Sequence, residues 1–503
     1  MALLGIDVGT SGTKVILLDS QGHIAANVTE EHPVSTPQPL WSEQDPKHWW
    51  LATCRAVQAA IAASGIPPDE IAGIGLSGQM VGLVTLDQRG RPLRPCILWN
   101  DQRSGEVTDE LTARIGLPKI LAETGNPLFP SFVAPKLAWM ARHEPDVYRQ
   151  IKHVLLPKDY VRYCLTGQIG TEVSDASGTC VFNVRRRQWS AEMLSAMDLP
   201  PEWFPPCSES DEVVGAITTT AAQETGLTKG TPVVAGGGDQ PMQALGSGIV
   251  RPGLCSVTLG TSGVVFAQSA RYLEHPEGLL HAFCHSVHGQ WYLMGVMLSA
   301  GGSFQWLRNL LTASAPTSYD EMTARAEQSP AGCEGLLFLP YLTGERVPYS
   351  DPNAKGCFVG LTPRHGQPQL IRAVMEGISF GLLDSLNLMR DLGIDIERVY
   401  ASGGATRSAF WRQMLADVFE TEIVTTNVTE GAAFGAAILA GVGTGCYRNA
   451  EEASDALSVV RERVCPDPRN LEAYRQNYAI YRSLYPQLAS TFAAITRRVC
   501  DNP

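Results

Sequence analysis

A four-residue turn that occurs twice constrains this chain most. Gly-Thr-Ser-Gly stands at residues 9–12 and again at residues 260–263, half the length of the 503-residue chain further on. Apolar runs flank both copies, in LLGIDVGTSGTKVILLD and in LCSVTLGTSGVVFA. Each copy predicts a strand, a tight turn and a second strand. The repeat indicates two related halves, and a chain of this length is expected to form two large domains.

Composition and charge narrow the class of protein. Hydrophobic residues make up 44% of the chain and charged residues 18%, which are values of a globular protein. The net charge of −12 is spread along the chain, so we expect no nucleic-acid partner and no membrane surface as partner. No apolar run is long enough to cross a bilayer, and the N-terminus lacks the basic start of a signal peptide. The twelve cysteines form no Cys-x-x-Cys pair, so a zinc or redox site is not predicted and a cytoplasmic location is expected.

Strand and helix patterns alternate along both halves, which indicates an α/β fold. A helix is predicted over residues 46–64, with Asp45 as its N-cap and Gly65 closing it. In the second half, helices are predicted to start in MLSAGGSFQWLRNLL and in GGATRSAFWRQMLADVF. The other elements predicted in the first half are strands at 71–76 and 81–86, and helices near 132–143 and 159–165.

A segment rich in glycine and proline, GSGIVRPG at residues 246–253, separates the two halves. We therefore predict one domain over residues 1–248 and a second over residues 249–445. Residues 446–503 are expected to form a helical extension that packs on the second domain.

The sequence GIGLSG at residues 73–78 matches Gly-x-Gly-x-x-Gly. A dinucleotide fingerprint needs a helix directly after the match, because the pyrophosphate lies at that helix's N-terminus. The segment that follows, QMVGLVTLDQRG, predicts a strand and a turn instead. We therefore interpret the match as structural, and the chain has no P-loop sequence either.

The repeated turn has a chemistry of its own. Glycine and small hydroxyl residues let backbone N–H groups approach an anion closely, so two such turns could hold the phosphates of one nucleotide. Asp7 ends the first strand, where its carboxylate could hold Mg²⁺. Lys14 could reach a phosphate as a point charge. The alternative is that each copy only makes a tight hairpin.

Two further segments carry candidate functional residues. In PVVAGGGDQPMQALG a β-like run ends in three glycines and is followed by Asp239. A carboxylate at such a strand end is placed like a general base, and a kinase needs a base to orient and deprotonate a substrate hydroxyl. The alternative is a solvated aspartate that caps the next helix. In ASGGATRSAFW, Gly403 and Gly404 could let a flat ring lie against the backbone, or could simply turn the chain from a strand into a helix.

These segments, in this order, resemble the FGGY family of carbohydrate kinases, in the superfamily of actin, hexokinase and the heat-shock ATPases. GIDVGTSGTKVILLD is similar to the family's first phosphate motif and LGTSGVVF to its second. SGGATRSAFWRQMLADVF resembles the adenosine motif, and EGAAFGAAILAG the segment after it. Within the family, the segments that resemble bacterial xylulokinases are PLWSEQDPKHWW, RPCILWNDQR, APKLAWMARHEP, LLPKDYVRYCLTG, SDASGT, FLPYLTGER and GVMLSA.

The resemblance implies two actin-like (ribonuclease H-like) domains with a duplicated core and an active site between them. The first domain would supply the sugar side and the first phosphate motif, the second the nucleotide side. It also implies phosphoryl transfer from MgATP to a ketopentose or pentitol, first of all D-xylulose to D-xylulose 5-phosphate. Asp239 matches the family's catalytic base and Asp7 its Mg²⁺-associated carboxylate. The residues that match nucleotide contacts are Thr10, Ser11, Lys14, Gly260, Thr261, Gly301, Gln305, Gly404, Ala405 and Ser408.

The expected sugar pocket departs from the family pattern at two positions. Xylulokinases typically have Met-His where this chain has Met80-Val81, and they commonly have Asn beside the base where this chain has Gln240. Because a site that pairs a substrate hydroxyl rejects analogues strongly, one lost polar partner can redirect specificity. Ribulose, L-xylulose, arabinitol, erythritol and glycerol are therefore alternative substrates. The predicted pocket residues are Gln79, Met80, Val81, Trp99, Asn100, Asp101, Asp239 and Gln240, with plain core packing as the alternative for Trp99.

A protein of another class could carry the same nucleotide motifs. An actin-like or heat-shock-like ATPase uses its nucleotide to switch partners and has no sugar substrate. Asp239 beside an expected sugar pocket argues against that interpretation. A homodimer is expected because relatives often form one.

Overall fold

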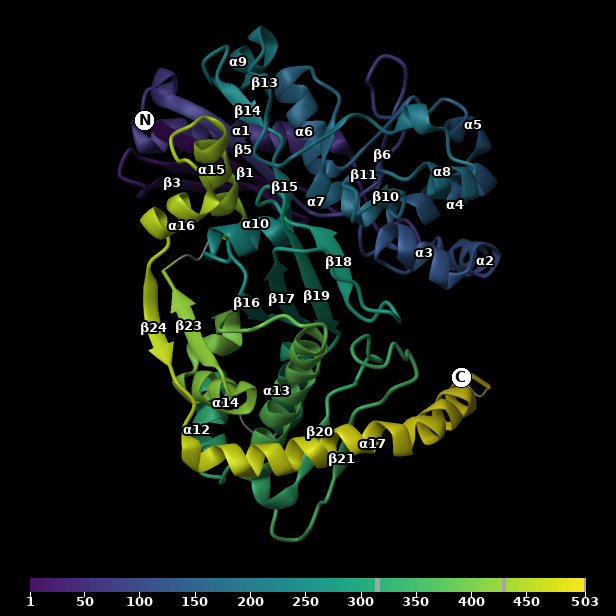
Figure 1. Cartoon of the computed structure of the whole chain (residues 1–503), viewed down its shortest axis with the longest axis vertical. Coiled ribbons are helices and arrows are strands. Elements are labelled where there is room, and N and C mark those ends of the chain that lie inside the picture. The colour runs from purple at the N-terminus through teal and green to yellow at the C-terminus, as the bar shows by residue number, and fades with distance from the viewer. Residues whose placement is uncertain (313–316, 428–430, 502–503) are drawn as a thin grey trace.

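The computed structural model describes residues 1–312, 317–427 and 431–501. The chain forms two seven-stranded sheets, each with helices packed on it, and the two lie one above the other in Figure 1. The first sheet comprises β1 (Ala2–Val8), β2 (Gly12–Leu18), β3 (Ile24–Glu31), β5 (Ile71–Gly78), β13 (Val213–Ala216), β14 (Pro232–Val234) and β15 (Gly237–Gly238). The second comprises β16 (Leu254–Leu259), β17 (Gly263–Ser269), β18 (His281–Cys284), β19 (Trp291–Met297), β22 (Arg398–Ser402), β23 (Glu422–Thr426) and β24 (Val460–Val464).

The two copies of the turn occupy equivalent places in the two sheets. β1 pairs antiparallel with β2 across the first turn and parallel with β5 on its other side. β16 pairs in the same way with β17 and β22. The register agrees as well, because Asp7 faces Ser77 in the first sheet where Thr258 faces Ser402 in the second. The predicted strand–turn–strand repeat and the α/β fold of two related halves are therefore confirmed.

The helix α1 (Pro46–Ser64) begins and ends where its sequence predicts. The Asp45 side chain accepts a hydrogen bond from the backbone N–H of Lys47 at 3.0 Å, and Gly65 ends the helix with φ 67°. The predicted helices near 132–143 and 159–165 are present as α4 (Val133–His143) and α6 (Pro157–Thr166).

The strand predicted at residues 81–86 begins later, as β6 (Val84–Leu86). Val81 has φ 57°, which is the left-handed region and cannot continue a strand. The apolar pattern alone therefore placed the start of this strand three residues too early.

Helices α10 (Asp239–Gly246) and α15 (Gly431–Gly443) cross between the two sheets (Figure 1). α15 packs directly on β1 and β5. A Cβ added to Gly75 would collide with the backbone carbonyl of Ala436, so glycine lets the helix approach the sheet. The Gly-x-Gly-x-x-Gly match lies in β5, and a turn follows it. Its interpretation as a structural motif is confirmed.

The last part of the chain does not stay on one domain. α15 and α16 (Ala450–Leu457) share a hydrophobic core with Leu3 and Leu18 of the first sheet. β24 then joins the second sheet beside β23, and α17 (Pro468–Asp501) lies along the second domain (Figure 1). The segment 446–503 therefore contains a strand and one helix that packs on the first domain, which corrects the expectation of a purely helical extension. The domain bounds at 248 and 445 stay predictions, and Glu430 of the EGAAFGAAILAG motif lies outside the described residues.

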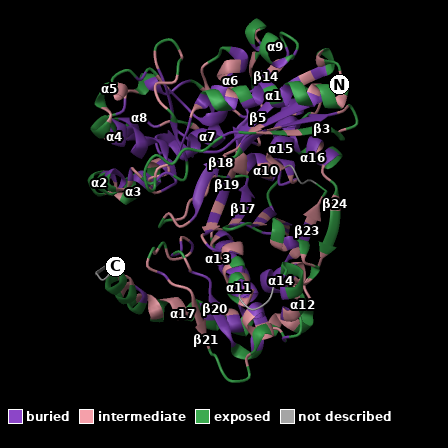
Figure 2. Ribbon diagram, turned by 180° about the vertical axis from the view of Figure 1, so that it is seen from behind, coloured by how far each residue is buried: buried purple, intermediate pink, exposed green. Residues whose placement is uncertain are grey.

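The helices around the two sheets enclose the core. Figure 2 shows β5 and β18 in the colour of buried residues. Among the described residues, no helix combines the length and the apolar character needed to cross a membrane. The helices on the second sheet include α11 (Gly301–Leu311), α13 (Gln367–Asp391) and α14 (Ala409–Phe419).

Candidate active site

Two carboxylates, Asp7 and Asp239, lie beside the same strand of the first sheet. Asp7 faces Ser77 of β5 across the parallel ladder. β15, which leads directly into Asp239, pairs with β5 through Gly237 opposite Ser77 and Gly238 opposite Gly78. Asp239 is the first residue of α10. The sheet therefore brings together two carboxyl groups that are far apart in the sequence.

The environment of Asp239 keeps its carboxylate available as a proton acceptor. Burial raises the pKa of Asp239 to about 7, and the negative charge of Asp7 adds to the rise. The hydrogen bond that its Oδ1 accepts from Gln240 Nε2 is long, at 3.4 Å. A carboxylate with a pKa near neutrality and few partners has the properties that a general base needs. The alternative of a fully solvated capping residue does not hold, since Asp239 is only partly exposed and begins α10 without capping it.

Asp7 is the better candidate for a cation. Burial raises the pKa of its carboxyl group, opposed by neighbouring Ser77 and by the positive charge of Lys14. Its Oδ1 atom is buried without a hydrogen-bond partner. No group of three acidic, histidine or cysteine side chains gathers into a metal site in the part of the chain that the structure describes. A single carboxylate with a free oxygen suits Mg²⁺, which is usually held by one or two carboxylates together with phosphates and water.

The three glycines before Asp239 are required by close packing. Gly236 has φ 88° and lies against Leu76 of β5. A Cβ added to Gly238 would collide with the side chain of Met80. Met80, a predicted pocket residue that is 9% exposed, therefore lies directly beside the backbone that carries Asp239.

The first turn is held by a network of amide side chains. Gln79 donates to the carbonyl of Gly9 at 3.3 Å and accepts from Thr10 Oγ1 at 3.1 Å. Gln44, which was not predicted, donates to the carbonyl of Thr10 at 2.6 Å and accepts from Gln79 at 2.9 Å. The indole of Trp99 donates to Thr10 Oγ1 at 3.0 Å, although the residue is 47% exposed. Plain core packing is thereby excluded for Trp99, and the structure brings Thr10, Gln79 and Trp99 together.

The second turn rests on the start of α11. The backbone N–H of Gly301 donates to the carbonyl of Gly260 at 2.9 Å, and Gly302 donates to Thr261 at 2.9 Å. A Cβ added to Gly301 would collide with the Gly260 carbonyl, so glycine is needed there. Gly260 and Thr261 themselves are exposed, as is Gln305 on the next turn of α11. These predicted nucleotide residues therefore form one surface.

The second glycine pair lies at the end of β22. Gly403 has φ 97°, and a Cβ there would collide with the carbonyl of Leu259. Gly404 is exposed and begins a short 3₁₀ turn that includes Ala405. Ser408 caps α14, because its Oγ accepts a hydrogen bond from the Trp411 N–H at 3.3 Å. The hydroxyl of Ser408 is therefore already engaged in the fold.

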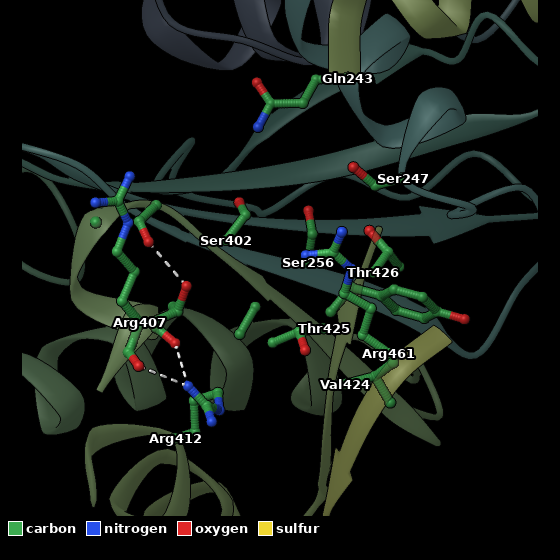
Figure 3. Close-up of a pocket in the computed structure, with 15 residues that line it drawn as sticks. Gln243, Ser247, Ser256, Ser402, Arg407, Arg412, Val424, Thr425, Thr426 and Arg461 are labelled. Carbon is green, nitrogen blue, oxygen red and sulfur yellow. Dashed lines mark hydrogen bonds between the residues drawn. The ribbon is translucent and has the colours of Figure 1, made fainter. Parts of the chain in front are cut away.

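A cavity of about 480 Å³ lies between α10 and the second sheet (Figure 3). Gln243 of α10, one helical turn after Asp239, lies across the cavity from Arg412. The cavity thus joins the helix that starts at Asp239 to the glycine pair at the end of β22. Its lining residues are Gln243, Ser247, Ser256, Tyr400, Ala401, Ser402, Gly403, Gly404, Thr406, Arg407, Arg412, Val424, Thr425, Thr426 and Arg461.

The remaining residues predicted for the sugar pocket differ in how far they are exposed. Asn100 is exposed, while Val81 is 7% exposed and packs against Gly178. Lys136, buried in α4, donates to the carbonyl of Val81 at 2.8 Å. This buried lysine was not predicted, and its signal was a charged residue inside the apolar run APKLAWM.

The surroundings of Asp101 do not favour its role as a sugar contact, which stays a prediction. Asp101 is fully buried, and both of its oxygens accept two hydrogen bonds each from Arg103 and the Ser42 backbone. A carboxylate has about four acceptor positions, so none is left for a sugar. Asp101 instead holds the segment that carries Trp99.

Comparison with known proteins follows the same division of the chain. The model of the FGGY family of carbohydrate kinases, N-terminal domain, matches residues 2–246, and the model of the C-terminal domain matches residues 255–444. The xylulose kinase of Escherichia coli (strain K12) is 42% identical over 491 residues, which cover 97% of this chain and 100% of that protein. The xylulose kinase of Bacillus subtilis (strain 168) is 35% identical over 483 residues, 96% of each chain. The crystal structure of xylulose kinase from Rhodospirillum rubrum superposes with a TM-score of 0.94 at 32% identity and covers 98% of this chain and 100% of that one.

Proposed function

This chain belongs to the FGGY family of carbohydrate kinases, and from that membership we propose that it phosphorylates D-xylulose to D-xylulose 5-phosphate. The protein is a sugar kinase with ATP as its phosphoryl donor and a small sugar as its substrate. The identity of the sugar rests on the curated relatives, which are xylulose kinases at 35–42% identity over nearly the whole chain.

The observation that carries the proposed chemistry is the state of Asp239. Phosphoryl transfer to a sugar needs a base that orients the attacking hydroxyl and accepts its proton. The pKa of Asp239 is raised to about 7, and the side-chain hydrogen bond that its carboxylate accepts from Gln240 is long, at 3.4 Å. We assign it as that base, because it combines proton affinity with an open acceptor position.

The two Gly-Thr-Ser-Gly turns would hold the phosphates. Thr10, Ser11 and Lys14 lie at the first turn, and Gly260 and Thr261 at the second. Backbone N–H groups of such turns attract anions. We propose that the phosphates of ATP bridge the two domains and that the adenosine lies towards Gly301, Gln305, Gly404 and Ala405.

Asp7 is the residue that would hold Mg²⁺, through the Oδ1 atom that has no partner within the protein. The bound cation would neutralise charge on the phosphates during transfer. The negative charge of Asp7 helps to raise the pKa of Asp239. A bound cation would weaken this repulsion between the two carboxylates.

Gln79, Met80 and Trp99 are the proposed sugar contacts, together with Val81, Asn100 and Gln240. Met80 lies against the backbone before Asp239, and Trp99 is half exposed beside the first turn. Val81 is the specific reason to keep other ketoses and polyols as a second candidate substrate class, since it offers no hydrogen bond where relatives carry a histidine.

The experiment that tests this function measures ADP release by the purified protein with MgATP. The acceptors are D-xylulose, L-xylulose, D-ribulose, L-ribulose, xylitol, D-arabinitol, erythritol and glycerol, with a reaction without sugar as the control. We expect D-xylulose to give the highest kcat/KM. A higher kcat/KM for another acceptor would overturn the substrate and keep the kinase. ATP hydrolysis that no acceptor changes would point to a nucleotide-driven switch protein instead.

A further inference from the structure

A buried ionic cluster lies behind the backbone that carries Asp239. Lys158 is fully buried, and its Nζ lies 2.8 Å from Asp159, 3.1 Å from Glu172 and 3.1 Å from Asp175. All three carboxyl side chains are buried as well. Burying charges is costly even when they are paired, so stability alone does not account for such a cluster.

The charges of the cluster hold one another in place. Burial lowers the pKa of Lys158, but the carboxylates of Asp159, Asp175 and Glu172 outweigh it, so the net shift is upward and the ammonium stays charged. Burial raises the pKa of Asp175, whose carboxyl group is paired with Lys158. Glu172, in contrast, accepts from the backbone N–H groups of Ser174 and Asp175 at 2.6 and 2.9 Å.

Ser174 links this cluster to the active site. Its Oγ donates to Glu172 Oε1 at 3.0 Å, and the same Oγ accepts from the backbone N–H of Gly238 at 3.0 Å. A hydroxyl has a single proton, so the bond to the charged Glu172 aims its lone pairs at Gly238. Gly238 is the residue immediately before Asp239 and the N-cap of α10.

The position needs an anchor because the chain there consists of glycine. Residues 236–238 have no side chains with which to hold themselves, and glycine has the largest backbone freedom of any residue. The N-cap residue of α10 is Gly238, so no capping side chain bonds to the first N–H groups of this helix. A base displaced by about 1 Å loses about a hundredfold in rate.

We propose that Ser174, held by Glu172 and Lys158, is a positioning residue for phosphoryl transfer. It fixes the peptide before Asp239 so that the carboxylate stays at reacting distance, and it does not touch the substrate. The proposal rests on the proposed function, in which Asp239 is the base. The hydroxyl of Ser174 also accepts a hydrogen bond from Ser286 Oγ at 3.4 Å. Because Ser286 belongs to the second domain, Ser174 contacts both halves of the chain.

The matched pair of variants is Ser174→Ala and Ser177→Ala. Both serines are fully buried in the same segment, and both hydroxyls accept from a backbone N–H. Ser177 bonds to Cys284 and Val173, and has no bond to the residue before Asp239. Loss of a buried hydroxyl that accepts from a backbone N–H is therefore matched, whereas the hydroxyl of Ser174 bonds to Glu172, Gly238 and Ser286.

We expect Ser174→Ala to lower kcat for D-xylulose phosphorylation about tenfold to a hundredfold, with both KM values changed by less than about twofold. Ser177→Ala should keep kcat within about twofold. Ser174→Cys fills the site with a slightly larger group that is a weaker acceptor, so it should also lower kcat. Unchanged kcat in Ser174→Ala, an equal fall in Ser177→Ala, or failure of both Ser174 variants to fold would overturn the inference.

Asp239→Asn and the wild type complete the experiment. Absence of sugar-dependent turnover in the wild type would contradict the proposed function itself. If the wild type turns over and Asp239→Asn does not, while Ser174→Ala keeps its kcat, only the positioning role is lost. The two failures are therefore distinguishable.

Discussion

The substitution Asp239→Asn should remove most of the activity and at the same time stabilise the folded protein. The carboxyl pKa rises from its ordinary value of 3.8 to about 7 because burial and Asp7 disfavour the ionised form. Keeping that group ionised in the folded state costs up to about 4 kcal/mol at high pH. The asparagine carries no charge and so avoids this cost, while its buried amide brings a smaller cost of about 1–2 kcal/mol.

The sign of the pH dependence follows from the raised pKa. Below about pH 3 the carboxyl is protonated in both folded and unfolded states, so only the cost of the buried amide remains and the variant is less stable by about 1–2 kcal/mol. Between pH 4 and 7 the unfolded state loses its proton first, and the wild type loses stability relative to the variant. Above pH 7 the difference is complete, at about 2–3 kcal/mol in favour of Asp239→Asn.

The assay is thermal unfolding of both proteins without ligands at pH 5 and pH 8, combined with kcat for D-xylulose. We expect the apparent Tm of Asp239→Asn to exceed that of the wild type by about 5 °C at pH 8 and by much less at pH 5. Its kcat should fall by about 10²–10⁴ or more, since general-base help is of that size. A lower Tm at pH 8, or near-normal turnover, would refute the assignment.

Asp87→Asn is the control of opposite sign. Asp87 accepts bonds from Arg89 and Arg91 on the surface, and the backbone and side chain of Arg91 lower its pKa to about 2. Its ionised form favours folding at pH above its unfolded pKa, and that contribution is lost as the pH falls towards 2. The substitution should therefore lower the Tm slightly at pH 8 and leave kcat unchanged.

Two further predictions concern the sugar pocket and the helix that crosses the sheet. Val81→His should raise the preference for D-xylulose over the other acceptors about tenfold in kcat/KM, because it adds a hydrogen-bonding side chain. Histidine also tolerates the φ of 57° better than a β-branched residue. An unchanged ranking of acceptors would count against Val81 as a specificity residue. Gly75→Ala should destabilise the protein by about 3 kcal/mol or more, since its Cβ would collide with the Ala436 carbonyl. Gly105 has open space around it, so Gly105→Ala is the control and should keep the wild-type Tm. Equal Tm values for the two variants would contradict the close packing of α15.

The strands and turns could be predicted where the chemistry is local. The repeated Gly-Thr-Ser-Gly turn and the caps of α1 at Asp45 and Gly65 depend on neighbouring residues, and the structure has them as expected. The helix start after Gly403 and Gly404 likewise follows from glycine chemistry. Local propensity carries this information because each signal acts within a few residues.

The parts that could not be predicted depend on contacts between distant segments. α15 follows β23 of the second sheet in sequence, yet it packs on β1 and β5, where Gly5 and Gly75 of the strands lie against alanines of the helix. Asp101 has the residue type of a sugar ligand, but its bonds to Arg103 and Ser42 use all of its acceptor positions. A sequence pattern shows which residues can do chemistry, whereas burial and partners decide whether they are free to do it.

The ionic cluster around Lys158 shows the same limit. A lysine after the apolar run LLP in LLPKDYV signals something unusual, because lysine is almost never fully buried unless it is paired. Its partners Glu172 and Asp175 lie in another segment, and their distances to it could be known only from the fold.

The most direct test of the account identifies the product. Wild-type protein, ATP, Mg²⁺ and D-xylulose are incubated to partial conversion, and ADP, inorganic phosphate and the sugar phosphate are quantified by ³¹P NMR. We expect one phosphorylated D-xylulose for each ADP and almost no inorganic phosphate. ADP and inorganic phosphate in equal amounts, with no phosphorylated sugar, would contradict it.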